Sequence, residues 1–157
     1  MARYIAIPKS THLAVVVATG ATIKSVLQVA TPATTNIRVL GWGVSFQATS
    51  GTPGICTLVA VDVAATVTAL TPDTWGSSFN QASLCIGGTS ATGYNASAEG
   101  SVGASRIFDA QLVSPAAGYS IWFPTPPVVP VSRFLRIRCT FGTTVNVLPW
   151  IVWEEPA

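Results

Sequence analysis

The sequence predicts an all-β protein: a single β-sandwich or small barrel, jelly-roll-like, with about eight strands and one long ordered loop excursion. Apolar and polar residues alternate along most segments, which is the two-residue period of a half-buried strand. No stretch of a dozen residues keeps the apolar stripe of a helix without an intervening Thr, Gly or Pro. Eleven prolines and thirteen glycines separate the strand-like segments, as expected of turns. We therefore expect at least ~40% strand and no helix longer than about two turns.

The predicted strands are short runs rich in β-branched and aromatic residues, bounded by turn residues. They cover residues 13–18, 23–29, 40–46, 55–63, 107–113, 119–123, 135–141 and 145–153. Pro149 lies inside the last of these runs. Because proline cannot donate a ladder hydrogen bond, we expect this strand to lie at a sheet edge or to carry a bulge.

Two of these strands define the expected core. Their inward-facing positions are Leu40, Trp42, Val44 and Phe46 on one strand and Leu135, Ile137, Cys139 and Phe141 on the other. The same alternation places Arg136 and Arg138 on the opposite face, together with Phe134 and Thr140. We expect the apolar faces of the two strands to pack against each other inside the sandwich.

Length and composition bound the function. A chain of 157 residues fits one domain, residues 1–157. Hydrophobic residues make up 49% of it and charged residues only 9%, against about 25% in an average protein. A monomer normally covers its surface with charged side chains. We therefore expect partner subunits to cover much of this surface, and the net charge of +2 without a basic stripe excludes a nucleic-acid partner.

The sequence gives little indication of a membrane-spanning segment, a metal site or a disulfide. No apolar run approaches the roughly 18 residues that span a bilayer, and the run at 13–18 is too short for a cleaved signal segment. Cys56, Cys85 and Cys139 form no CxxC pair, and the single histidine, His12, cannot complete a Cys/His metal set. We expect three buried thiols made in a reducing cytoplasm, with one disulfide as the alternative, and no metal or other cofactor.

Residues 71–103 interrupt the strand rhythm. This segment is rich in Ser, Gly, Thr, Ala and Asn and carries scattered large side chains, among them Trp75, Phe79 and Tyr94. A loop of this length inside a compact domain is usually functional or disordered, and disordered segments are charged and poor in aromatics. Two interpretations remain open: an ordered excursion that packs on a neighbouring subunit, and a self-packed loop with a short strand at 82–86.

Candidate catalytic groups do not assemble into a recognisable site. The loop between Gly88 and Gly93 lacks the lysine that a phosphate loop needs after its second glycine. His12 is the sole candidate base for a serine or cysteine nucleophile. Asp62 and Asp109 could meet across a sheet as an acid pair, but we expect them to pair with Arg38, Arg106, Arg136 or Arg138 instead. Glu154 and Glu155 are adjacent, so a strand turns them to opposite faces. We expect no enzymatic activity.

The basic cluster of Arg133, Arg136 and Arg138 has two interpretations. It forms either a solvated outer face or a dock for an acidic partner surface, since arginine suits fixed pairing with carboxylates. The candidate interface residues are Trp75, Phe79, Tyr94, Arg136 and Arg138.

Several stretches resemble small structural proteins of tailed bacteriophages, in particular those of phages that infect actinobacteria. They are Leu40-Gly41-Trp42-Gly43-Val44-Ser45-Phe46, the Gly-rich run from Gly87 to Gly100, and Pro149-Trp150-Ile151-Val152-Trp153-Glu154-Glu155. The resemblance implies a capsid decoration (cement) protein, made in the host cytoplasm and located on the capsid surface of the virion. It implies a homotrimer that binds the major capsid protein, with no catalytic residues and no cofactor.

A second function class stays open beside this one. A carbohydrate- or surface-binding β-sandwich, such as a receptor-binding module, would gather exposed aromatics on one face. Trp75, Tyr94, Trp122, Trp150 and Trp153 are the candidates for such a face.

Overall fold

The structure is a computed structural model that describes residues 1–48, 51–76 and 81–156. These residues are all-β, with 55% of them in strands and no helix among them, which confirms the predicted fold class. The described residues form fifteen strands rather than about eight, because residues 13–18 form two strands and six further strands lie in segments where none was predicted.

Two sheets account for most strands. The first, here called the β6 sheet, has the order β12-β6-β15-β1-β9, with β13 also paired to β6 and β4 to β15. Its strands are β12 (Tyr119–Trp122), β6 (Ile37–Phe46), β15 (Asn146–Glu155), β1 (Ala2–Ala6), β9 (Asp73–Thr74), β13 (Val128–Val129) and β4 (Val17–Ala18).

The second sheet, here called the β7 sheet, has the order β11-β7-β14-β5-β10-β8. Its strands are β11 (Ser105–Val113), β7 (Gly54–Val61), β14 (Phe134–Thr140), β5 (Lys24–Ala30), β10 (Gly93–Ala98) and β8 (Thr66–Ala69). A separate ribbon pairs β2 (Lys9–Ser10) with β3 (Leu13–Ala14).

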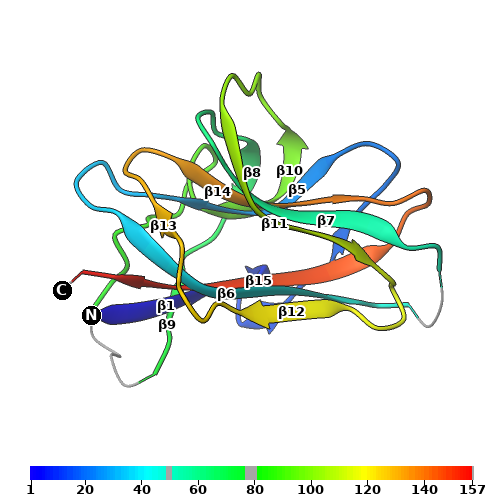
Figure 1. Ribbon diagram of the computed structural model, residues 1–157, viewed down its shortest axis with the longest axis horizontal. Helices are drawn as coiled ribbons and strands as arrows, with labels where there is room; N and C mark the ends of the chain where they lie inside the picture. The colour runs from blue at the N-terminus through cyan, green and yellow to red at the C-terminus, as the bar shows by residue number, and fades with distance from the viewer. Residues whose placement is uncertain (49–50, 77–80, 157) are drawn as a thin grey trace.

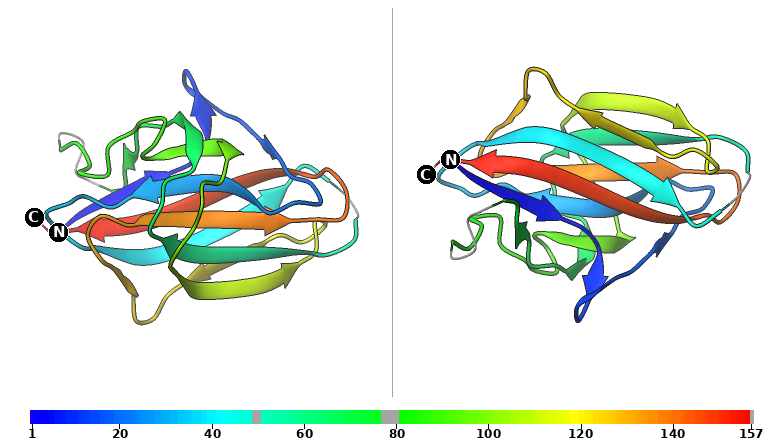
Figure 2. Two further views of the ribbon diagram at one scale, coloured as in Figure 1. Left: turned by 90° about the horizontal axis from the view of Figure 1, so that it is seen from above. Right: turned by 90° about the horizontal axis from the view of Figure 1, so that it is seen from below.

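The two sheets lie one above the other and do not close into a barrel (Figure 1). The chain crosses between them repeatedly, since β5, β7, β11 and β14 belong to one sheet and the strands that follow or precede them, β6, β12 and β15, belong to the other. Both termini lie at the same end of the sandwich, and Figure 2 shows the β2–β3 ribbon projecting from the body.

The predicted core is confirmed at most of its positions. Trp42, Val44, Leu135, Ile137, Cys139 and Phe141 are all buried in one cluster between the sheets. Phe46 is partly buried and packs edge-on against Phe141, with the ring centroids 5.2 Å apart.

The prediction for Leu40 is wrong, because β6 carries a bulge. Its partner β15 places Trp153 opposite Val39 and the preceding Val152 opposite Gly41, so Leu40 is the extra residue. A bulge shifts the alternation by one position. Val39, which precedes the bulge, is therefore fully buried, whereas Leu40 is only partly buried.

Trp42 also joins the two sheets through polar contacts. Its Nε1 donates to Oδ2 of Asp109 on β11 at 3.1 Å, and the same oxygen accepts from the Tyr119 hydroxyl at 2.8 Å. The rings of Trp42 and Tyr119 are 5.3 Å apart. A buried indole N–H needs such an acceptor, and here the acceptor comes from the opposite sheet.

Pro149 lies in a central strand, so the expected edge position is wrong. One side of Pro149 nevertheless lacks a paired strand. Pro149 is opposite Val44 of β6 on one side. On the other side, β4 pairs with β15 up to Val147 and β1 pairs only from Ile151 onward. Pro149 thus occupies the gap between two neighbouring strands, where no ladder hydrogen bond is lost.

Two further segments differ from the prediction. Residues 13–18 form two short strands, β3 and β4, and not one. The alternative strand at 82–86 is absent, and the strand of this region is β10. The excursion contributes β9 to the β6 sheet and β10 to the β7 sheet, so its described part packs on its own chain.

Truncation of Trp42 to alanine should lower the free energy of unfolding by roughly 3–5 kcal/mol, as for other buried large aromatics. Leu40→Ala should cost less than half as much, because its side chain lies outside the core. Chemical denaturation of the two variants measures both values. A larger loss for Leu40→Ala than for Trp42→Ala would contradict the bulge and the inward direction of Trp42.

Candidate functional site

Exposed aliphatic side chains gather on the outer face of the β7 sheet. We call this group the aliphatic patch; it consists of Ile23, Ile55, Ile107 and Leu112. Leu112 is opposite Ile55 in the ladder, so both side chains point to the same face, and they are 73% and 54% exposed. A bulge at Phe108 lets Ile107, 62% exposed, point outward as well. An apolar group of this kind on a sheet face is typical of an interaction surface.

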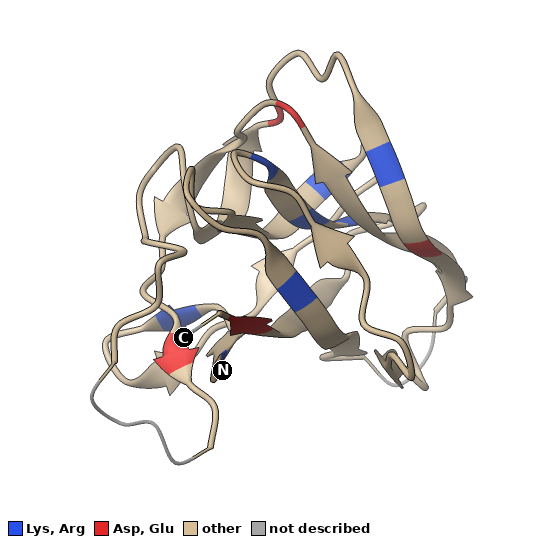
Figure 3. Ribbon diagram, turned by 60° about the vertical axis from the view of Figure 1, so that its left-hand side comes forward, with Lys and Arg blue, Asp and Glu red and all other residues tan. Residues whose placement is uncertain are grey.

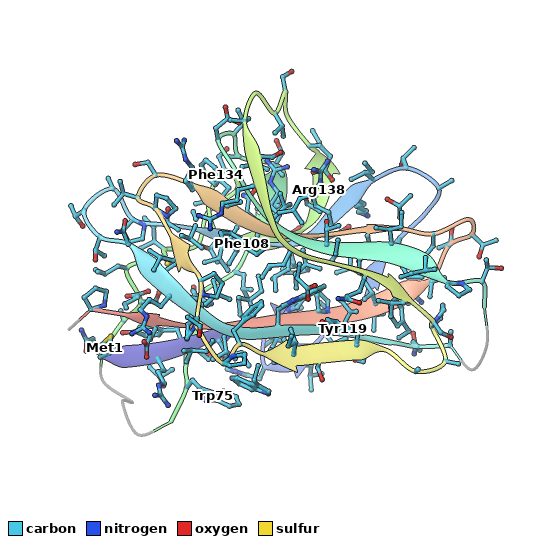
Figure 4. All side chains as sticks on the ribbon, in the orientation of Figure 1. Met1, Trp75, Phe108, Tyr119, Phe134 and Arg138 are labelled. Carbon is cyan, nitrogen blue, oxygen red and sulfur yellow. The ribbon has the colours of Figure 1, made fainter. Side chains whose placement is uncertain are left out.

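A groove of about 350 Å³ lies within the aliphatic patch. Three of the patch isoleucines line it, together with Thr57, Val59, Ser105, Thr140 and Arg138. Figure 4 shows Arg138 on the outer side of this sheet, as its place in the alternation predicts. Its Nε is buried and has no hydrogen-bond partner among the described residues. Arg138 therefore retains a donor without a partner in a groove that is lined mainly by apolar surface.

Arg136 lies on the predicted face of the sheet, but the predicted exposure is wrong. Its side chain is 0% exposed, so it belongs neither to a solvated face nor to a surface that a partner can reach. Nη1 donates to Oε2 of Glu99 at 3.0 Å, Nε donates to Oε1 of Gln28 at 3.0 Å, and Nη2 donates to the carbonyl of Val63. Segments that follow β7 and β10 cover this part of the face.

The hydrogen bonds of Arg136 hold the end of the segment 71–103 against the sandwich. Glu99, which follows β10, accepts from the backbone N–H and, at 2.5 Å, from the hydroxyl of Ser25 in β5. Burial lowers the pKa of Arg136, and the charge of Glu99 opposes this change. A buried charge needs such a partner, so the pair is structural.

Three tryptophans gather on the outer face of the β6 sheet. We call them the tryptophan strip: Trp75, Trp122 and Trp150. The ring centroids of Trp75 and Trp122 are 6.0 Å apart, and those of Trp122 and Trp150 are 5.3 Å apart. Trp75 and Trp122 are 42% and 51% exposed, and Figure 4 shows Trp75 on the side of this sheet that faces away from the core.

The remaining aromatic candidates do not join the strip. Trp153 is fully buried beside Tyr4, and its Nε1 donates to Glu155. Tyr94 lies in β10 of the other sheet and is partly buried against the core. Phe79 lies outside the described residues. Of the predicted interface residues, only Trp75 and Arg138 are thus placed on outer faces, and they are on different sheets.

The candidate acid pairs are separate and serve the fold. Asp109 accepts from Trp42, Tyr119 and Gln111, and Asp62 accepts from the backbone of Gly103, so the expected pairing with arginines is wrong for both. Hydrogen bonds from the backbone of Ala104, followed by Gly103, lower the pKa of Asp62.

Glu154 and Glu155 point to opposite faces, as predicted. Glu154 lies between Arg38 and Arg3 of the two flanking strands, with N–O distances of 3.1 and 3.6 Å. Glu155 is buried and accepts from Ser83, from the backbone of Leu84 and from Trp153. Neither carboxylate faces a hollow with a second acid.

The nucleophile and base candidates are also apart. His12 is exposed in the turn of the β2–β3 ribbon. All three cysteines are buried free thiols, and the Sγ atoms of Cys56 and Cys139 are 3.3 Å apart. The hydrogen bond to Cys56, with burial, raises the pKa of the Cys139 thiol, and burial raises that of Cys85. All three thiols are thus shielded from solvent by burial.

Charged side chains are few and mostly used within the chain. Figure 3 shows them as isolated positions on an otherwise uncharged ribbon. Over residues 1–48, 51–76 and 81–156 there is no group of three His, Cys, Asp or Glu side chains that could bind a metal ion. Within the same residues no helix is long and apolar enough to cross a bilayer.

Comparison with other proteins adds no assignment: the chain matches no protein-family model, no curated protein and no solved structure with which it was compared. The two outer faces are therefore the features from which function must be inferred. The alternation in the sequence places both arginines on the outer face of one strand. The predicted candidates for one aromatic face include the three tryptophans of the strip, but also Tyr94 and Trp153, which do not belong to it.

Replacement of Arg136 by alanine should destabilise the fold by roughly 3 kcal/mol, because it removes the charge that balances Glu99 and one of the two donors to the Gln28 oxygen. Arg138→Ala, two residues along the same face, should cost under about 1 kcal/mol. Chemical denaturation measures both. Equal small losses would show that Arg136 is solvated and that the excursion is not held by this pair.

Tyr119 should lose its proton at a higher pH than an ordinary tyrosine. Burial and the hydrogen bond to Asp109 raise its pKa to about 12, above the ordinary value of about 10. Because the folded state holds this proton more tightly, the contribution to stability is complete below about pH 10 and is lost as the pH rises towards 12. Absorbance at alkaline pH should show two tyrosines that ionise late, Tyr119 and the fully buried Tyr4, whose pKa burial also raises. Tyr119→Phe should remove one of these two late ionisations. A normal titration of all tyrosines would contradict the contact.

Proposed function

We propose that this chain is a structural virion protein, a capsid decoration protein that forms a homotrimer and binds the major capsid protein on the surface of a phage head. The sequence resemblance described above supports this proposal. The observation that carries it is the aliphatic patch, which gives the β7 sheet an outer face suited to contact with protein.

The low charge of the surface supports self-association in particular. Most carboxylates are paired or hydrogen-bonded within the chain: Glu154, Glu155, Glu99, Asp73 and Asp109 all have internal partners. Few charged groups therefore remain free to keep a protein with an exposed apolar face soluble as a monomer. Association of copies with closed cyclic symmetry covers such a face. Weak contacts repeated over a lattice then add through avidity, so no deep pocket is needed.

The oligomeric state tests the first half of the proposal. Sedimentation equilibrium of the purified protein should give the mass of a closed oligomer, with the trimer expected. Leu112→Lys places a charge within the aliphatic patch and should shift the protein to monomer. Leu13→Lys is the matched control, since Leu13 is equally exposed, at 75%, but lies in the β2–β3 ribbon.

Binding to shells tests the second half. The wild-type protein should co-sediment with undecorated capsids, and Leu112→Lys should do so more weakly because avidity is lost. A wild-type protein that stays monomeric at every concentration and never co-sediments with a shell would overturn the proposal.

A further inference from the structure

We propose that the tryptophan strip is a binding site for an extended, uncharged, β-linked polysaccharide, held in its binding geometry by two glycines of β6. The site lies on the opposite side of the sandwich from the aliphatic patch. It does not depend on the role proposed for that patch.

The glycines explain why two of the rings can approach the sheet so closely. Gly41 and Gly43 flank the inward-facing Trp42, so both face outward. A Cβ added to Gly43 would lie 2.6 Å from Nε1 of Trp150, and one added to Gly41 would lie 2.9 Å from Cε3 of Trp122. Both distances are too short for a real side chain, so the two rings rest directly on the backbone of β6. The planes of neighbouring rings are tilted by 37° and 38° to one another, and Trp75 and Trp122 remain about half exposed.

The strands that carry these two rings lie on either side of β6. Trp122 of β12 is directly opposite Gly41, and Trp150 of β15 is directly opposite Gly43. The rings therefore lean onto β6 from its two neighbours, and Trp75 extends the row beside Trp122. Because the backbone supports them, the rings lose little conformational freedom when a ligand binds.

An open hollow of about 330 Å³ lies beside Trp150. Ser45 and Ser120 line it with exposed hydroxyl groups, together with Val44, Ala117, Gly118 and Tyr119. No carboxylate, lysine or arginine lines the hollow, and the hydroxyl of Tyr119 already donates to Asp109 in the core. The volume is at the lower end of the range of small-ligand sites.

Aromatic faces beside uncharged hydroxyls suit a sugar. The C–H face of a pyranose packs on an indole, and its hydroxyls bond to serine side chains and free backbone groups. A β-1,4-linked chain is an extended, flat ribbon, which fits a row of rings on the flat face of a sheet. The Ser45 hydroxyl donates to the carbonyl of Leu148 within the chain. An apolar protein surface would instead cover the exposed hydroxyl of Ser120 without supplying a partner, which is costly.

Isothermal titration calorimetry with defined oligosaccharides tests the site. Cellohexaose and chitohexaose are the β-1,4-linked probes, and maltohexaose is the α-1,4-linked comparator. At least one β-linked probe should bind the wild-type protein, and more tightly than maltohexaose. Trp122→Ala should weaken this binding by roughly tenfold or more.

Gly43→Ala is the sharper variant. It keeps every tryptophan but displaces the Trp150 ring, so it should weaken binding to a similar extent. Leu13→Ala in the β2–β3 ribbon is the matched control and should bind as the wild type does. Circular dichroism and the melting temperature show that each variant is folded.

Three results would overturn the proposal. The first is no heat of binding with either β-linked probe. The second is binding that Trp122→Ala and Gly43→Ala leave unchanged, or that maltohexaose matches. The third is a change of sedimentation mass in Trp122→Ala without any loss of sugar binding, which would make the strip a contact between copies.

Discussion

The contact between Trp42 and Asp109 links the interior of the protein to its outer surface. The indole donates across the sandwich to a carboxylate of the opposite sheet, and the Tyr119 hydroxyl completes the group. Because this contact turns Trp42 inward, it also turns Gly41 and Gly43 outward. A trough forms where side chains would otherwise stand, and two tryptophans lie in it. The core and the candidate binding face thus depend on the direction of one residue in β6.

The sequence was sufficient for the fold class and for the inward direction of most core residues, because the two-residue period is a local property. It was not sufficient where a bulge shifts that period. Leu40 follows the pattern of Trp42 in the sequence, but the extra residue in β6 places it on the other side of the alternation. Which strand accommodates a bulge depends on the register with its partner, here β15, about a hundred residues away.

The candidate site was less predictable, because it depends on which segments meet. Arg136 lies on the predicted face, but the loops that contain Glu99 and Val63 cover it. No local sequence pattern indicates that a distant loop will cover a residue. The tryptophan strip likewise draws on three distant segments. The sequence does contain one signal of it: two glycines at consecutive outward positions of a strand leave room for something large to lie there.

The central claim is that the two outer faces serve different partners: the β7 sheet contacts other protein chains, and the β6 sheet stays open to a ligand. Hydroxyl-radical footprinting of the assembled protein tests this most directly, with dilute protein as the reference. We expect Ile107 and Leu112 to become protected on assembly while Trp75 and Trp122 stay as reactive as before. Protection of Trp75 and Trp122 with unchanged labelling of Ile107 and Leu112 would contradict the account.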